Sequence, residues 1–454
     1  MDKTTVVEWL HDQLGERLCG DETMGELERM VDECTREMRR MLLERLTRET
    51  AAAVEPGCPH CGRMLNVVSH RRTRTVDSSV GAVQFMRSYG RCTHCQVYVH
   101  PADVALGLHA RGRLSPRVQE ICALATLQSP AGGAAEDVRR MTGVEVSAST
   151  LHREALRQGE RALRLRDRDA ALSECPTGVD ALASRAPHMP ANSTMIVEID
   201  AWNIRERDCW GWTRELREAG EEPGRWHWVY TGTVFRLDQR GTDGGGRPVI
   251  TERGYVATRR GIESFGRQLY AEALQRGLRQ AETVLVLGDG AVWIWNLAGK
   301  QFKGASQRLD LFHVKEHLWN LAAELHGKGT AEAEEWVRPY LRWLERRKNG
   351  ALDLIDSLEQ LQRRLGTFDQ DRKDALAREI GYLRQHKDRM DYKNAKALGQ
   401  PCGSGAIEST CSQYQCRFKR TGQFWSLAGD EAFLALATLH RNGRWDTLFP
   451  HDQL

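Results

Sequence analysis

Residues 194–202 read TMIVEIDAW, and residues 282–290 read ETVLVLGDG. Each run of apolar residues is typical of a buried strand, and an aspartate marks the end of each, Asp200 in the first and Asp289 in the second. An unpaired carboxylate is costly to bury, so each aspartate needs a cation or a position at the edge of a sheet. The two stretches therefore predict an α/β sheet that carries an aspartate at two strand ends.

The segments around these strands extend the α/β pattern. Residues 225–237 and 247–258 are predicted strands, and residues 261–280 form a predicted helix. Three strands, a helix and a buried strand are the order of a ribonuclease-H-like sheet. The highly charged residues that follow are predicted to be helical, which indicates an α-helical insertion at about 320–395 within a catalytic domain spanning 190–454.

A third carboxylate lies in GSGAIES, residues 403–409, where glycines precede a predicted helix and place Glu408 in its first turns. Two strand-end aspartates and a helix glutamate suit a pair of Mg²⁺ or Mn²⁺ ions, because hard cations favour carboxylate oxygens and water. Two such ions about 3.5–4 Å apart activate an attacking oxygen and stabilise the leaving one. A strand-end aspartate alone is more often a helix cap, so the prediction depends on all three residues together.

Two C-x2-C pairs, Cys58/Cys61 and Cys92/Cys95, are separated by 30 residues. Four thiolates close a tetrahedral Zn²⁺ site without an open position, which predicts a structural zinc ribbon over residues 56–110. A redox C-x2-C pair is the alternative, but it needs no second copy at this spacing. His60 and His94 lie inside the knuckles and could replace a cysteine ligand.

The remaining N-terminal sequence is predicted to be helical. Residues 1–55 show helical spacing of apolar side chains, and residues 111–175 predict a helix-turn-helix-like region. In that region Ser115 and Pro116 begin one helix, and a turn at Gly143 precedes a second helix that is headed by polar residues. A stretch rich in Pro and Gly, residues 175–193, predicts a domain boundary.

Basic residues are unevenly distributed. The chain has a net charge of +3, whereas residues 58–117 contain nine Arg against two Asp, a local charge of about +7. A basic segment in a near-neutral chain favours phosphate binding, although a solvated surface has the same composition. The candidate DNA contacts are Arg71, Arg72, Arg74, Thr150, Arg153, Arg417, Lys419 and Arg420. The residues that head the second helix could equally be caps, and those after Glu408 a solvated helix end.

Several motifs together resemble one family. VEIDAW, RERDCWGW, LGDGAVWIWN, LDLFHVKEHLW and GSGAIES…CRFKRTGQFWS are similar to the ISKra group of DDE-type insertion-sequence transposases, over nearly the whole chain. The resemblance implies that Asp200, Asp289 and Glu408 are the catalytic carboxylates, and that the long gap before Glu408 holds a helical insertion. It implies metal-dependent cleavage and strand transfer at the ends of an insertion sequence.

The residues following the second aspartate contain competing candidates. Asp310 is the main rival to Asp289 as the second carboxylate, and His313 and His317 share a helix face as supporting residues or weak metal candidates. Trp293 and Trp425 are candidates for stacking on DNA bases.

The expected protein is thus a multidomain α/β enzyme that acts on double-stranded DNA, namely terminal inverted repeats and target. It is expected to act as a homodimer or higher oligomer on DNA, in the cytoplasm with the nucleoid, because no apolar run is long enough to span a bilayer. A non-catalytic DNA-binding protein descended from a transposase, or a ribonuclease-H-like nuclease that cuts without joining, remains as an alternative.

Overall fold

The computed structural model describes residues 3–15, 18–207, 212–221, 224–365 and 369–450. It divides into two compact units, here called the N-terminal unit (residues 1–157) and the C-terminal unit (residues 158–450). Among the described helices, none is both long enough and apolar enough to cross a bilayer. Cys209 and Trp210 of the RERDCWGW motif lie outside the described residues.

The division between the units falls inside one long helix, α6 (Ala148–Leu172), and not in the stretch 175–193 that the sequence favoured. That stretch contains α7 (Pro176–Ala183), whose Leu182 is buried against α9 of the C-terminal unit. Apolar packing therefore makes the Pro- and Gly-rich stretch part of the larger unit.

The N-terminal unit combines a three-stranded antiparallel sheet with helices. The sheet has the order β1-β2-β3, and its β1–β2 hairpin closes at Ser78↔Gly81. The elements are α1 (Lys3–Gly15), α2 (Met24–Ala53), β1 (Asn66–Ser78), β2 (Gly81–Arg91), β3 (Tyr98–Val99), α3 (Pro101–Ala105), α4 (Pro116–Gln128), α5 (Ala131–Thr142) and the start of α6. The β-rich module expected after Cys58 is therefore present.

The end of this unit has the predicted helix, turn and helix. Ser115 caps α4 by accepting a 3.3 Å hydrogen bond from the N–H of Val118. Gly143 ends α5 in the left-handed conformation, at φ 69°, where a side chain would be strained. Val118, Val138 and Leu151, all fully buried, join α4, α5 and α6 in one small core.

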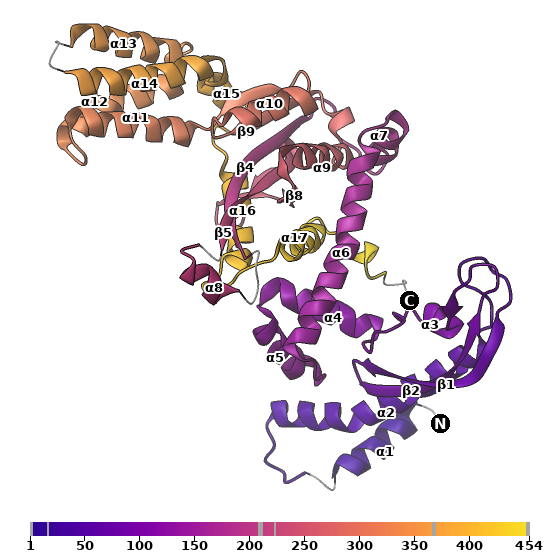
Figure 1. The fold of residues 1–454 in the computed structure, drawn as a ribbon. Helices are drawn as coiled ribbons and strands as arrows, with labels where there is room; N and C mark the ends of the chain where they lie inside the picture. Colours follow the sequence, from indigo (N-terminus) through magenta and orange to yellow (C-terminus); the bar gives the residue numbers. More distant parts are fainter. Residues whose placement is uncertain (1–2, 16–17, 208–211, 222–223, 366–368, 451–454) are drawn as a thin grey trace. The chain divides into compact units, whose positions relative to one another are not determined.

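A mixed five-stranded sheet forms the centre of the C-terminal unit (Figure 1). Its order is β10-β9-β4-β5-β8, in which β5 is antiparallel to β4 and β8, whereas β9 and β10 run parallel to β4. The strands are β4 (Thr194–Glu206), β5 (Arg225–Arg236), β8 (Gly254–Thr258), β9 (Thr283–Gly288) and β10 (Ser306–Leu309). The sequence predicted four of these strands. It missed β10, which has only four residues, most of them polar.

One predicted strand, residues 247–258, is split in two. Its first part is β7 (Pro248–Ile250), which pairs with β6 (Arg240–Thr242) in a separate hairpin, and its second part is β8. Thr251 closes the hairpin because its N–H and hydroxyl both donate to the carbonyl oxygen of Gln239, at 3.0 and 3.2 Å.

Helices cover both faces of the sheet. Alternate residues of β4 point to opposite layers, so Ile199 packs with α9 (Gly261–Gln275) and α10 (Val292–Gln301). Ile196 faces the layer of α16 (Gly405–Phe418). The other elements of this unit are α8 (Thr213–Glu218), α17 (Leu427–Arg441) and the short helices η1 (Leu237–Gln239), η2 (Leu278–Gln280), η3 (Lys387–Arg389) and η4 (Trp445–Thr447).

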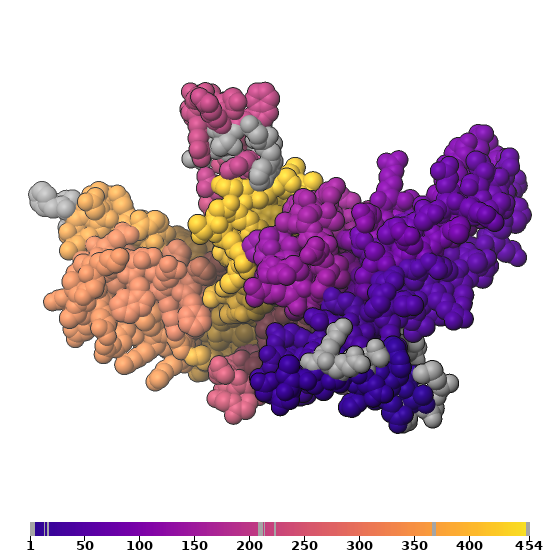
Figure 2. Space-filling model, turned by 90° about the horizontal axis from the view of Figure 1, so that it is seen from below, coloured from indigo at the N-terminus to yellow at the C-terminus, as the bar shows by residue number. Residues whose placement is uncertain are grey.

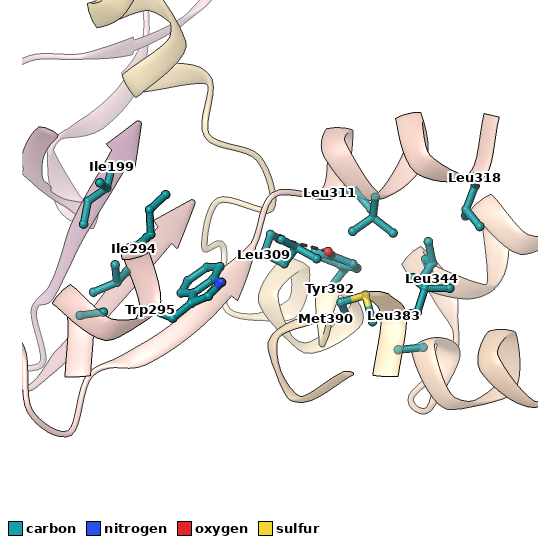
Figure 3. Packing of buried hydrophobic residues seen from close by; sticks show 14 of the residues in the cluster. Ile199, Ile294, Trp295, Leu309, Leu311, Leu318, Leu344, Leu383, Met390 and Tyr392 are labelled. Atoms are coloured by element: carbon teal, nitrogen blue, oxygen red, sulfur yellow. Dashed lines mark hydrogen bonds between the residues drawn. The ribbon is translucent and has the colours of Figure 1, made fainter. Parts of the chain in front are cut away.

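The predicted helical insertion is present and starts earlier than expected, at Leu311. Its helices are α11 (Leu311–His326), α12 (Ala331–Arg346), α13 (Gly350–Arg364), α14 (Gln370–His386) and α15 (Tyr392–Ala397). Figure 3 shows apolar side chains running from the sheet into this bundle without interruption. Tyr392 is fully buried at the junction and donates a 3.0 Å hydrogen bond to the carbonyl oxygen of Leu309.

Candidate active site and candidate metal centre

The two aspartates end neighbouring strands. The last parallel pair between β4 and β9 is Glu198↔Leu287, and Asp200 and Asp289 each follow that pair by two residues. Because strand side chains alternate with a period of two, the two carboxylates leave the sheet at the same edge and on the same side. Asp289 also accepts a 3.0 Å hydrogen bond from the N–H of Ala291, which fixes the turn into α10.

Helix α16 places the third carboxylate beside them. Its first turn docks on β4 through a 2.9 Å hydrogen bond from the N–H of Ile407 to the buried carboxylate of Glu198. One turn after Glu408, the buried thiol of Cys411 lies close enough to Asp200 for each group to shift the pKa of the other. Both contacts hold Glu408 on the side of the sheet from which Asp200 projects.

The pKa shifts of Asp200 and Glu408 agree with this proximity. Burial raises the pKa of Asp200, and the charge of Asp289 raises it further. Burial, Asp310 and Asp200 raise the pKa of Glu408, while His313 lowers it. A bound divalent cation would relieve this mutual repulsion, so the donor set fits a hard metal ion.

The carboxylates are spread more widely than the ligands of a single ion. Among the described residues, the four cysteines discussed below are the only group of three or more candidate ligands within 4.8 Å of one another. Oxygen ligands of two ions about 3.5–4 Å apart need not all be that close, because each ion adds about 2 Å on either side.

Asp310, which the sequence offered as a rival metal-binding carboxylate, has a structural role in the fold. It is fully buried, and it caps α11 by accepting a 2.5 Å hydrogen bond from the N–H of Phe312. It also accepts a 2.7 Å hydrogen bond from the N–H of Ser404 and another from the Ser404 hydroxyl. Because both carboxylate oxygens are engaged, Asp310 joins the insertion to the start of α16, and its charge acts on Glu408 from there.

The two histidines of α11 have separate surroundings. The Nδ1 of His317 lies 2.8 Å from the Glu379 carboxylate, and its ring stacks on Tyr382 with centroids 3.9 Å apart. His313 instead acts electrostatically on both Asp200 and Glu408. His317 is thus a satisfied packing residue, and His313 is the histidine that belongs to the carboxylate site.

Two of the basic candidates are buried, which corrects the expectation that they contact DNA. Arg74 forms a 2.5 Å ion pair with buried Asp103 and donates to two backbone carbonyls, so it ties β1 to α3 and to the segment that follows α3. Arg417 packs its guanidinium over the rings of Trp425 and Phe433 at 5.4 and 5.5 Å, and burial lowers its pKa to about 10.

The other basic and polar candidates keep access to solvent. Arg71, Arg72, Arg153, Lys419 and Arg420 are exposed, and Thr150 is half-buried. Arg153 donates to the Thr150 hydroxyl at 3.2 Å and to the Ser149 carbonyl at 3.3 Å, so these residues also brace the start of α6.

The two tryptophans expected to stack on DNA bases are engaged within the fold. Trp293 packs edge-on against Tyr230 and Phe265, with ring centroids 5.1 and 6.2 Å apart. Trp425 is 4 % exposed and stacks on Phe418. The buried Trp425 ring has no room for a base, whereas Trp293 is partly buried.

The four cysteines that the sequence predicts as metal ligands form the second candidate site. The sulfur atoms of Cys58, Cys61, Cys92 and Cys95 all lie within 4.8 Å of one another. The Sγ atoms of Cys61 and Cys92 are 3.6 Å apart, close to the edge of about 3.8 Å expected for a tetrahedron with Zn–S bonds of about 2.3 Å. This cluster could bind a structural metal such as zinc.

The local backbone favours the thiolate form of Cys92, whereas the neighbouring Cys61 thiol and burial raise the pKa of Cys95. The N–H of Cys95 points at the Cys92 sulfur at 3.4 Å, and such donors lower the pKa of Cys92 to about 6. His60 and His94 are exposed and stand outside the cysteine group, so the ligand set is the four cysteines.

Several contributors to the carboxylate site were not recognised in the sequence. Neither Cys411 nor Ser404 was among the residues predicted to contribute to the site. Tyr382 lies in the insertion, 93 residues after Asp289, and its hydroxyl is 3.4 Å from the Asp289 carbonyl oxygen. Only the spacing of three residues between Glu408 and Cys411 could have indicated Cys411, because this spacing places both residues on one helix face.

Comparisons with known proteins add no further assignment. No protein-family model matches the sequence, and no curated protein matches it.

Proposed function

We propose that this chain is a DDE-type transposase of the kind its motifs resemble, an enzyme that cleaves DNA at the ends of an insertion sequence and transfers the strands to a target. The observation that carries the proposal is the convergence of Asp200, Asp289 and Glu408 from β4, β9 and α16. The motif resemblance gives these same three residues as the catalytic carboxylates.

The sheet supports the same proposal. A strand order with β4 at the centre, in which only β5 is antiparallel to it and β8, β9 and β10 run parallel to it, fits a ribonuclease-H-like core. In that interpretation the carboxylates belong to the first strand, the fourth strand and a later helix. The insertion between β10 and α16 accounts for the long gap before Glu408.

The chain's own residues suit two-metal phosphoryl transfer. Divalent ions, when bound, would activate the attacking oxygen and stabilise the leaving 3′ oxygen of the DNA strand. The ions would be held by Asp200, Asp289 and Glu408. The start of α16, which carries Glu408, is fixed by the hydrogen bonds that Ile407 and Ser404 donate to the carboxylates of Glu198 and Asp310. The strand-transfer step forms one phosphorus–oxygen bond to the incoming 3′-OH and breaks one in the target strand.

The four-cysteine cluster and the helix-turn-helix-like helices would recognise the terminal repeats. The exposed Arg71, Arg72 and Arg153 lie on these elements and would contact phosphates or base edges. Because strand transfer needs two DNA ends held together, a dimer or larger assembly on DNA is part of the proposal.

The test is an assay with labelled duplexes that carry the element's own terminal repeat, with added Mg²⁺ or Mn²⁺. The wild type is compared with Asp200→Asn, Asp289→Asn and Glu408→Gln, and with Asp356→Asn as an exposed control on α13. We expect cleavage and joining by the wild type and the control, and their loss, with DNA binding retained, in the three site variants. Cleavage without joined products would favour a nuclease, and binding without any chemistry would favour a non-catalytic DNA-binding protein.

A further inference from the structure

Beyond the candidate active site, strands β4 and β5 continue as a two-stranded arm. The last pair of β4 with β9 is Glu198↔Leu287, and the last pair of β5 with β8 is Tyr230↔Thr258. Residues 202–206 and 225–229, here called the arm, pair with each other and with no further strand of the described residues. In Figure 2 the adjoining segment that contains α8 stands out from the surface of its unit.

The two faces of the arm differ sharply in burial. On one face Trp202, Ile204 and Glu206 are buried beneath α16 and α17. On the other face Trp226 and Trp228 are 56 % and 55 % exposed. Tryptophan is normally highly buried, so two exposed neighbours on the same strand face indicate a binding surface.

Cations lie close to Trp226 and to the neighbouring ring of Phe424. The Nζ atom of Lys419 lies 5.6 Å from the ring centroid of Trp226, and the guanidinium of Arg205 lies 5.8 Å from it. Arg205 also lies 5.0 Å from the ring of Phe424, and the guanidinium of Arg207 lies 4.0 Å from that ring. Aromatic faces interleaved with cations are the composition of surfaces that bind unpaired nucleic acid strands, because rings stack on bases while cations contact phosphates.

The arm also lies near the carboxylates. Trp228 pairs with Asn203, three residues beyond Asp200 on the same strand. At about 3.3 Å per residue this separation along the strand is about 10 Å. Because side chains alternate along a strand, this odd offset places Trp226 and Trp228 on the face of the sheet opposite to Asp200.

We propose that Trp226 and Trp228 stack on unpaired bases of a DNA strand whose phosphates contact Lys419 and Arg205. The proposal rests on the proposed function and deepens it, because it makes DNA with an unpaired end, and not a fully paired duplex, the preferred ligand of the protein. The proposal assigns base stacking to these two exposed tryptophans and not to Trp293 and Trp425, the candidates from the sequence.

The test measures binding alone, with the full-length protein and no added Mg²⁺. Fluorescence anisotropy compares a blunt duplex with the same duplex carrying a few unpaired nucleotides at one end. The variants are Trp226→Ala/Trp228→Ala and Trp226→Phe/Trp228→Phe, with Trp319→Ala as control, since Trp319 is 42 % exposed on α11. Thermal melting and sedimentation accompany each variant.

We expect the wild type to prefer the duplex with the unpaired end. The double alanine variant should lose about tenfold or more of that preference, given stacking of about 1–3 kcal/mol per base. The double phenylalanine variant and the control should keep most of it. The proposal is overturned by a wild type without preference, by equal weakening for both DNAs, or by a change of oligomeric state, which would make the surface a contact between copies of the chain.

This result is independent of the cleavage assay. Preference for the unpaired end without any cleavage by the wild type would refute the transposase and leave the stacking surface intact. Cleavage that needs Asp200, without the preference, would refute the stacking surface alone.

Discussion

The buried carboxylate of Glu198 accepts a 2.9 Å hydrogen bond from the backbone N–H of Ile407, the residue immediately before Glu408. Glu198 precedes Asp200 by two residues, so one strand face carries both a candidate metal ligand and the anchor for the helix that brings another. The link spans 209 residues of sequence and connects the centre of the sheet to α16.

Removing this anchor should cost stability. Glu198→Ala leaves the N–H of Ile407 with only the Ser404 carbonyl oxygen, 3.1 Å away, as its acceptor, which costs about 0.5–1.5 kcal/mol in the free energy of unfolding. Glu198→Gln keeps an oxygen at the same place and should lose less. Urea denaturation measures both, with exposed Glu335→Ala as control. Equal losses for the alanine and glutamine variants would contradict the role assigned to this hydrogen bond.

Asp310 should behave as a structural residue. Asp310→Ala removes the α11 cap, worth about 0.5–2 kcal/mol, and leaves the buried N–H of Ser404 without an acceptor. We expect a lower melting temperature together with retained Mg²⁺ binding, measured by calorimetry on folded protein. Loss of Mg²⁺ binding at unchanged stability would instead make Asp310 a metal ligand in place of Asp289.

Asp430 predicts a specific pH dependence. Burial and the neighbouring Glu206 raise its pKa to about 9, which the nearby Arg259 offsets only in part. The folded state therefore holds a proton that the unfolded state loses above about pH 4, so stability falls as the pH rises toward 9.

Asp430→Asn replaces the titrating carboxyl group with an amide that does not titrate. The difference in unfolding free energy between the wild type and this variant should shift by up to about 1.4 kcal/mol per pH unit between pH 6 and pH 8, in favour of the variant. Denaturation at three pH values measures the slope, and the exposed Asp356→Asn serves as the control. A difference that does not vary with pH would show that Asp430 is ionised in the folded protein.

The cysteine cluster predicts one bound zinc ion per chain. Cys61→Ser should abolish zinc binding and expose the β1–β2 hairpin to protease, because a structural metal contributes folding free energy to its module. Elemental analysis and limited proteolysis measure these effects, and Cys416→Ser, an exposed cysteine far from the cluster in sequence, should retain the metal. Zinc retained in the Cys61 variant would refute the four-cysteine ligand set.

Much of the architecture could be predicted from local sequence signals. The apolar runs that end at Asp200 and Asp289 form strands, Ser115 and Gly143 delimit helices, and the cysteines form one cluster. These predictions succeeded because strand periodicity, helix capping and metal-ligand spacing depend on residues that are neighbours in the chain.

The failures share a physical reason. Arg74 and Arg417 look like phosphate ligands in sequence, but Asp103 and the rings of Trp425 and Phe433 engage them in the fold. Strand β10 escaped notice because a partner strand, and not its own composition, stabilises it. Partners that are distant in the sequence decide whether an arginine is buried or a short segment forms a strand. The residues next to these positions in the chain do not reveal those partners.

The sequence by itself determined which residues could bind metals and which segments alternate as strands and helices, since both follow from residue type and short-range spacing. Only the tertiary structure decided that Asp200 and Asp289 end adjacent strands, that Glu198 and Asp310 hold the start of α16, and that Trp226 and Trp228 remain exposed. Burial and pairing are properties of surfaces that meet in space, so they arise only when distant parts of the chain pack together.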